Sequence, residues 1–145
     1  MTIGAFIYKT LHDNFNVENS IGDKIFPMVA EQGTALPYVV YQAIGVEPVR
    51  TKYRRPKQNK IDIQITCYHD RYDKATLIMR GVRALLEGYK GERSNISINN
   101  IVFTNSRDMY DKEAKVMGLS MDFKIWLNTS YDYSVDDYDF NEYQV

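Results

Sequence analysis

The stretch that decides the fold is residues 60–69, Lys-Ile-Asp-Ile-Gln-Ile-Thr-Cys-Tyr-His. Ile61, Ile63, Ile65 and Cys67 alternate with Asp62, Gln64, Thr66 and Tyr68, which is the two-residue period of a strand with one buried face. Residues 118–127 repeat this alternation. Two strands of this kind predict a sheet with one face on the core and the other face more polar.

A helix is predicted between these two strands, over residues 71–87. Asp70 is expected to be its N-cap, and Gly88 is suited to end it. Asp73 lies in the first turn, where its negative charge interacts favourably with the helix dipole. Its apolar side chains recur at helical spacing and should cover the inner face of the sheet. They are Ala75, Ile78, Met79, Val82, Leu85 and Leu86.

The remaining segments complete an α+β domain. Residues 3–12 have helical periodicity, residues 37–44 and 96–104 are rich in strand formers, and a short extended piece surrounds Phe26. Strand 37–44 is apolar on both sides and is expected to lie centrally; Asn99-Asn100 indicates a tight turn or a bulge. The predicted order is α-β-β-α-β-β, with an antiparallel or mixed sheet of about four to five strands and two main helices on one face.

No repeat or Gly/Ser linker divides the chain, so residues 1–130 are expected to form a single domain. Residues 131–145 form a C-terminal tail with five acidic and no basic side chains, punctuated by five aromatic residues. A tail of this composition is either a solvated segment or one that docks on a partner surface. The aromatic residues are Tyr131, Tyr133, Tyr138, Phe140 and Tyr143.

Composition excludes several classes of protein. Eighteen basic and nineteen acidic residues in 145 leave a net charge of -1, which disfavours a general binder of nucleic acid or membrane surfaces. No apolar run is long enough to span a bilayer and no secretory signal is visible, so a cytoplasmic protein is expected. The single cysteine, Cys67, excludes an internal disulfide, and with only two histidines it disfavours a zinc site.

Enzyme signatures are not found in the sequence. There is no phosphate-binding glycine loop, paired-histidine helix or nucleophile elbow. Cys67 and His69 lie two residues apart on one strand face and invite a metal or thiolate interpretation, but Cys67 continues an isoleucine row and is more simply a core residue. We therefore predict no catalytic, cofactor-binding or metal-binding residues.

The most unusual local feature is the basic run of residues 50–60, between two predicted strands. It is either a solvated hairpin loop or an arm that meets phosphate or an acidic protein surface, with an aromatic ring available for stacking. The candidate partner-facing or DNA-facing residues are Arg50, Lys52, Tyr53, Arg54, Arg55, Lys57 and Lys60.

A second candidate site is an interface between subunits. Trp126 lies on the otherwise polar side of the last predicted strand, and a buried Trp is a frequent interface anchor. If the second side of the sheet packs on another subunit, Trp126 and Tyr68 would be buried there. The tail residues Tyr133, Tyr138 and Phe140 join them as candidate interface residues.

The order of these segments resembles a known family. In the order of its segments, the chain is similar to tail-completion or tail-terminator proteins of long-tailed bacteriophages and prophages. The segments that carry the resemblance are Ile25-Phe26-Pro27, then Leu36-Pro37-Tyr38-Val39-Val40-Tyr41-Gln42, the polar loop, Ile61-Asp62-Ile63-Gln64-Ile65, the helix ending Leu85-Leu86-Glu87-Gly88 and the strand Met121-Asp122-Phe123-Lys124-Ile125-Trp126. The resemblance covers about residues 3–128 and depends on order and spacing, because no single motif is specific.

This resemblance implies a structural virion protein at the neck-proximal end of the tail, assembled in the host cytoplasm. Its subunits would form a hexameric ring that caps the tail tube, ends tube polymerisation and joins a neck or head-completion protein. DNA would pass through the ring, and the family supplies no active-site residues. The tail after Asn128 lies outside the pattern.

Two alternatives stay open from the sequence. A neck or head-completion protein of the phage connector also forms rings that face DNA. From a different class, a small nucleic-acid-binding module would use the basic run with Tyr53, and its affinity would fall steeply with salt.

Overall fold

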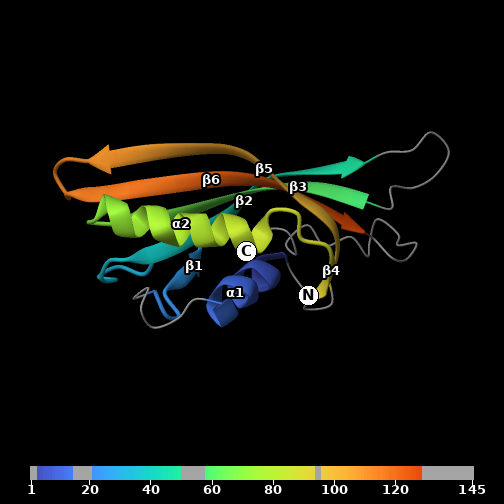
Figure 1. Ribbon diagram of the computed structural model, residues 1–145, viewed down its shortest axis with the longest axis horizontal. Helices are drawn as coiled ribbons and strands as arrows, with labels where there is room; N and C mark the ends of the chain where they lie inside the picture. The colour runs from blue at the N-terminus through green and yellow to red at the C-terminus, as the bar shows by residue number, and fades with distance from the viewer. Residues whose placement is uncertain (1–2, 15–20, 50–57, 94–95, 129–145) are drawn as a thin grey trace.

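The two alternating stretches form adjacent strands in the middle of the sheet (Figure 1). In the computed structural model, which describes residues 3–14, 21–49, 58–93 and 96–128, strand β3 (Gln58–His69) pairs antiparallel with β6 (Val116–Asn128) along its whole length. Ile61 lies opposite Ile125 and Ile63 opposite Phe123, so their apolar rows face the same side. The predicted alternation is therefore confirmed.

Six strands form one mixed sheet in the order β1-β2-β3-β6-β5-β4. All neighbours are antiparallel except β1 and β2, which are parallel. The other elements are α1 (Ile3–Asn14), β1 (Ile25–Pro27), β2 (Tyr38–Val49), α2 (Tyr72–Leu86), β4 (Gly91–Arg93) and β5 (Ile96–Asp111). The α+β class, the two helices and the pairing of consecutive strands agree with the prediction.

Several details of the predicted sheet are wrong. The sheet has six strands rather than four to five, because the three-residue strand β4 is too short to show a period. β1 corresponds to the extended piece predicted around Phe26. β5 runs to Asp111 rather than Thr104, since pairing with β6 keeps its polar second half extended. β2 is not central: β1 covers only Val39–Tyr41, and from Gln42 onward no described strand lies on its outer side.

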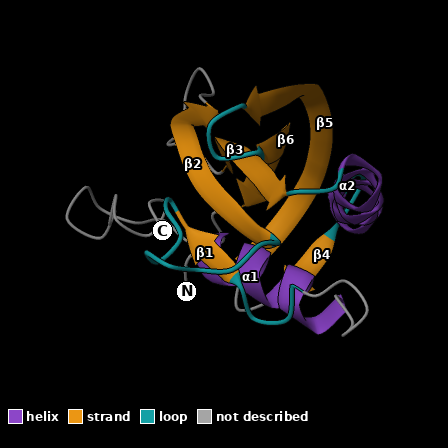
Figure 2. Ribbon diagram, turned by 90° about the vertical axis from the view of Figure 1, so that its left-hand side faces the viewer, coloured by secondary structure: helices purple, strands orange, loops and turns teal. Residues whose placement is uncertain are grey.

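Both helices pack on the face of the sheet that carries the isoleucine row. Phe6, Ile7 and Leu11 of α1 belong to one buried cluster together with the apolar stripe of α2 and residues 61, 63, 65 and 67 of β3. Figure 2 shows α2 beside the twisted sheet and α1 at its base, between β1 and β4. This side of the sheet is called the core face below.

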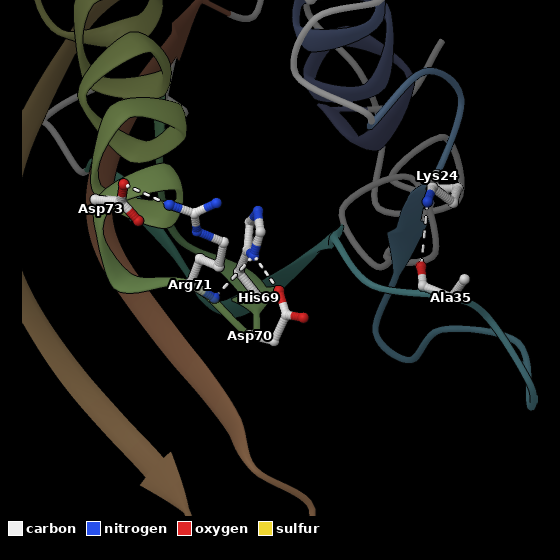
Figure 3. A network of polar contacts seen from close by, with 6 residues as sticks. All are labelled: Lys24, Ala35, His69, Asp70, Arg71 and Asp73. Carbon is white, nitrogen blue, oxygen red and sulfur yellow. Dashed lines mark hydrogen bonds and ion pairs between the residues drawn. The ribbon is translucent and has the colours of Figure 1, made fainter.

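The ends of α2 differ in part from the prediction. The N-cap is Arg71 rather than Asp70, and it makes no side-chain capping bond. Asp70 instead lies 2.9 Å from Nδ1 of His69, which also accepts a hydrogen bond from the Arg71 N–H at 3.1 Å (Figure 3). At the other end Gly88 has φ +79°, the left-handed conformation that glycine adopts without strain, as predicted for a residue that ends a helix.

The long outer strands are protected along their edges. The Gly88 N–H donates to the Ile101 carbonyl of β5 at 2.8 Å, the Arg83 guanidinium lies 4.0 Å over the Phe103 ring, and the Tyr72 hydroxyl donates to Asp108 at 2.9 Å. Helix α2 thus follows the outer edge of β5. β2 carries a bulge between Ala43 and Gly45 and has Pro48 in its free half, two features that discourage pairing with a further strand.

Candidate interaction surface on the second face of the sheet

The side of the sheet opposite the helices is called the second face. Its residues are neighbours by register across β2, β3, β6 and β5, and within the described ranges no helix packs on it. The strands run between two ends of the molecule. The hairpin end is where β5 turns into β6, on the left of Figure 1, and the loop end is where β2 runs into residues 50–57 and β6 ends at Asn128.

The middle of the second face is a closed polar ladder. Gln42 Nε2 donates to Gln64 Oε1 at 3.3 Å, and Gln64 Nε2 donates to Asp122 Oδ1 at 3.3 Å. Arg107 Nη1 lies 3.9 Å from the other carboxylate oxygen of Asp122. Because these side chains bind one another across four strands, the ladder is better suited to holding the sheet together than to binding a ligand.

One row nearer the hairpin end, Thr66 and Ser120 share a hydrogen bond of 2.7 Å. Both residues are buried although no described helix covers them. The hydroxyl pair therefore satisfies two groups that water does not reach.

At the hairpin end the second face becomes aromatic. The Phe26 and Tyr38 rings are 6.3 Å apart, and the Tyr38 and Tyr68 rings are 5.2 Å apart. Burial, and then the charge of Tyr68, raises the pKa of the Tyr38 hydroxyl above its usual value. These three residues with Met109 form a row across the sheet, which we call the terminal belt.

Gly118 explains how the terminal belt continues from β3 to β5. Gly118 lies opposite Tyr68 on one side and Met109 on the other. A Cβ on Gly118 would be 3.2 Å from Cε1 of Tyr68 and 3.5 Å from Cε of Met109. The missing side chain thus lets the tyrosine ring lie over β6, as aromatic residues often do beside a strand glycine.

The candidate interface residues Tyr68 and Trp126 lie on the same face but at opposite ends of it. Trp126 is half-buried at the loop end, opposite Lys60 and Asn100, whereas Tyr68 lies opposite Gly118. Eight residues of extended strand separate Gly118 from Trp126, which is about 27 Å. A single small contact cannot cover both residues.

Other predicted site residues lie mostly outside the described ranges. Lys60 belongs to β3 and is half-buried on the second face. The structure does not describe the other candidates. These are Arg50, Lys52, Tyr53, Arg54, Arg55 and Lys57 of the basic run, and Tyr133, Tyr138 and Phe140 of the tail. Their proposed roles therefore stay predictions.

The interpretation of Cys67 as a core residue is confirmed. Cys67 is fully buried, and burial raises the pKa of its thiol to about 12, so the thiol is protonated at neutral pH. His69 is also buried, at the point where β3 leads into α2. Across residues 3–14, 21–49, 58–93 and 96–128, no group of three or more His, Cys, Asp and Glu side chains is placed to hold a metal ion.

Sequence reasoning missed most of the terminal belt. Tyr38 and Tyr68 could have been assigned to one face from the alternation of each strand, but their contact depends on the register of β2 against β3. Met109 was missed because the predicted strand ended at Thr104, whereas β5 continues to Asp111. Figure 3 shows the same end from close by, where Lys24 Nζ also binds the Ala35 carbonyl at 3.1 Å.

These features define a class: a small α+β protein whose sheet is covered by helices on one face and, within the described residues, by no helix on the other. Among the described residues, no helix is long and apolar enough to cross a membrane.

Comparison with known proteins identifies the family. Residues 5–128 match the family model described as "Tail completion protein gp17", and the chain therefore belongs to this family of phage tail completion proteins. Among the curated proteins none matches the chain.

The fold is also shared with solved structures. A chain of the structure described as "Virion of native gene transfer agent (GTA) particle" superimposes with a TM-score of 0.72 and 16% sequence identity. The match covers 88% of this chain and 95% of that chain. At this identity the similarity shows the fold.

Proposed function

We propose that this chain is a structural virion protein that caps the head-proximal end of the phage tail tube as a ring of six subunits. The ring ends tube polymerisation and forms the surface that joins the neck or head-completion protein. The observation that carries the proposal is the family match over residues 5–128, which covers both helices and all six strands almost completely. The role is architectural rather than catalytic.

The geometry supports a protein that works through surfaces. The helix-covered face is closed, whereas the second face has a half-buried Trp126 at one end and the terminal belt at the other. Ring formation needs two different patches on each subunit, because a head-to-tail contact closes into a ring only when unlike surfaces meet. Trp126 at the loop end is one candidate for such a subunit contact.

The basic run supplies the second part of the proposal. The run, residues 50–60, contains six basic and no acidic side chains and includes the connection from β2 to β3. In the ring this segment lines the lumen beside DNA or grips the adjoining ring. Either partner gives a charge-dependent contact, so the interaction should weaken with salt.

The solution mass, alone and after mixing with tail tube protein, tests the cap. We expect either a species of about six times 16.9 kDa or a monomer that becomes a ring only on the tube. A monomer that ignores tubes and binds portal-containing heads would instead identify a neck protein. A monomer that ignores both and binds DNA with a steep salt dependence would identify a nucleic-acid-binding module.

Charge reversal tests the basic run. Changing Arg54, Arg55 and Lys57 to Glu should abolish head–tail joining while the subunit stays folded. A matched control reverses two exposed cations of α2, Lys74 and Arg80, which lie away from the loop end. Full infectivity of the loop variant would contradict the assigned role of the run.

A further inference from the structure

The outer face of α2 is the side of the helix that is turned away from the sheet. Leu77, Gly81 and Ala84 follow one another at intervals of four and three residues, so they share one side of the helix, opposite its buried stripe. Figure 2 shows no described element beyond α2 on this side. Leu77 is 61% exposed, so the outer face presents a large apolar group to solvent.

Gly81 is not required by the packing of its own subunit. Nothing lies within 4 Å of the position that a Cβ on Gly81 would take. Glycine in the interior of a helix lowers stability relative to alanine, and Gly81 is in the middle of α2. Close approach of a further segment to the outer face would give this glycine a structural reason.

Two positive charges flank Leu77 on the outer face. Lys74 and Arg80 lie three residues before and after Leu77, and both are exposed. Neither forms an ion pair within the described ranges, whereas the other charged groups of α2 and its ends are paired. Those pairs are Arg71 with Asp73 at 3.3 Å, Arg83 with Glu87 at 2.8 Å and Asp70 with His69 at 2.9 Å.

The C-terminal tail has the complementary chemistry. Residues 131–145 contain five acidic side chains, five aromatic rings and no basic side chain. A surface that binds them should offer cations and an apolar patch together, as the outer face does. The basic run offers charge with a single aromatic ring, and the exposed Met28 and Val29 are followed closely by Glu31, which would repel the tail.

The tail is long enough to reach the outer face. Asn128 ends β6 opposite Ser97, and four residues further along β5 the Ile101 carbonyl accepts the N–H of Gly88, just after α2. Strand dimensions place Asn128 roughly 15–20 Å from Gly88. Residues 131–145 span about 50 Å when extended, and α2 is about 22 Å long. A tether of this length gives an effective concentration in the millimolar range, which favours the helix of the same subunit over that of a second copy.

We propose that residues 131–145 dock on the outer face of α2 in their own subunit. The aromatic rings cover Leu77 and Gly81, and the carboxylates lie beside Lys74 and Arg80. The tail lies beyond residues 5–128, which the family match covers. Because the contact is made within one subunit and away from the loop end, it does not depend on the proposed function.

Disulfide cross-linking of the full-length chain tests the contact. Ala84→Cys on the outer face is combined with Asn141→Cys, which leaves every acidic and aromatic side chain of the tail in place. The native Cys67 does not interfere, because it is buried and its thiol is protonated at neutral pH. Two matched pairs combine Asn141→Cys with Val29→Cys beside β2 or with Lys52→Cys in the basic run.

Under a mild oxidant, the pair with Ala84→Cys should form an intramolecular disulfide about tenfold or more faster than either matched pair, because docking raises the local concentration of the two thiols. Changing Lys74 and Arg80 to Glu should slow this reaction about threefold or more. The same reversal at two exposed cations elsewhere, Lys9 and Lys90, should leave the rate unchanged.

Gly81→Gln separates docking from folding. The new side chain has open space within its own subunit and favours the helix, so the melting temperature should stay or rise. The cross-linking rate should fall, because the side chain occupies the place of the tail. Slower cross-linking in a more stable protein is not an effect of unfolding.

Three results would overturn the proposal. Equal rates for the three cysteine pairs would show that the tail is solvated. A faster disulfide with position 52 would show that it docks on the basic run, and disulfides between two chains would show that it docks on another subunit. All readouts use the protein without tubes, neck protein or DNA, so none of these results would bear on the proposed tail cap.

Discussion

The two faces of the central sheet are built from the same strands but perform different physical tasks. The core face is a continuous apolar layer, in which Ile61, Ile63 and Phe123 have almost no exposed surface. The second face is divided along its length into the terminal belt, a polar ladder and the Trp126 end. Its interior is stabilised by side-chain hydrogen bonds between strands, whereas the core face is stabilised by packing against helices.

This difference shows how one sheet can be both stable and available for interaction. If the second face were uniformly apolar, it would need a covering layer or would associate without specificity. Closing its middle with the Gln42–Gln64–Asp122 ladder restricts apolar exposure to the ends. The ends are therefore where partners are expected.

The largest effect should come from the core face. Changing Phe123 to Ala removes a fully buried ring that also packs edge-to-face on Phe103 at 5.8 Å. The free energy of unfolding should fall by roughly 3–5 kcal/mol, because a large cavity is left. Chemical denaturation measures this change. The decrease in unfolding free energy should exceed that of the second-face variants described next. A smaller decrease would contradict the view that packing on the core face is the main source of stability.

Gly118 tests the terminal belt. Changing Gly118 to Val should destabilise the protein by roughly 1–3 kcal/mol, because the new side chain takes the space of the Tyr68 ring. In a double-mutant cycle, Tyr68→Ala should relieve part of this loss. Additive effects of the two substitutions would show that the ring does not depend on the glycine.

The Thr66–Ser120 pair tests the buried polar part of the second face. Changing Thr66 to Val should cost roughly 1–3 kcal/mol, because the Ser120 hydroxyl is left buried without its partner. Adding Ser120→Ala should recover much of the loss, and denaturation curves of the three variants measure it. If the single change costs nothing, water must reach Ser120.

Cys67 gives a smaller, pH-dependent effect on the core face. Burial raises the pKa of the folded thiol from 9.0 to about 12, so above pH 9 the unfolded chain releases a proton that the folded chain keeps. The contribution of the protonated thiol to the free energy of unfolding is thus fully present below pH 9 and is lost as the pH rises toward 12. At one pH unit above 9, about 1.4 kcal/mol of this contribution is lost. The difference in unfolding free energy between the wild type and Cys67→Ala should show this slope. A pH-independent difference would mean that the folded thiol ionises normally.

The sequence determined the elements whose periodicity is strong. The alternation in residues 60–69 and 118–127, the apolar stripe of α2 and the glycine at its end predicted β3, β6 and α2 almost to their boundaries, because side-chain period follows directly from backbone geometry. The order of segments also resembled the family that the chain belongs to. The burial of Cys67 in the core also followed from the sequence, because Cys67 continues the same row of isoleucines.

Only the tertiary structure decided the rest, because the contacts that matter there join distant parts of the chain. Partner strands imposed β4 and the polar half of β5, and neighbouring side chains closed the polar ladder. The register of β2, β3, β6 and β5 brought Tyr38, Tyr68 and Met109 into one belt and placed Trp126 about 27 Å from it. Periodicity tells which face a side chain takes, but only pairing between strands tells which residues on that face are neighbours.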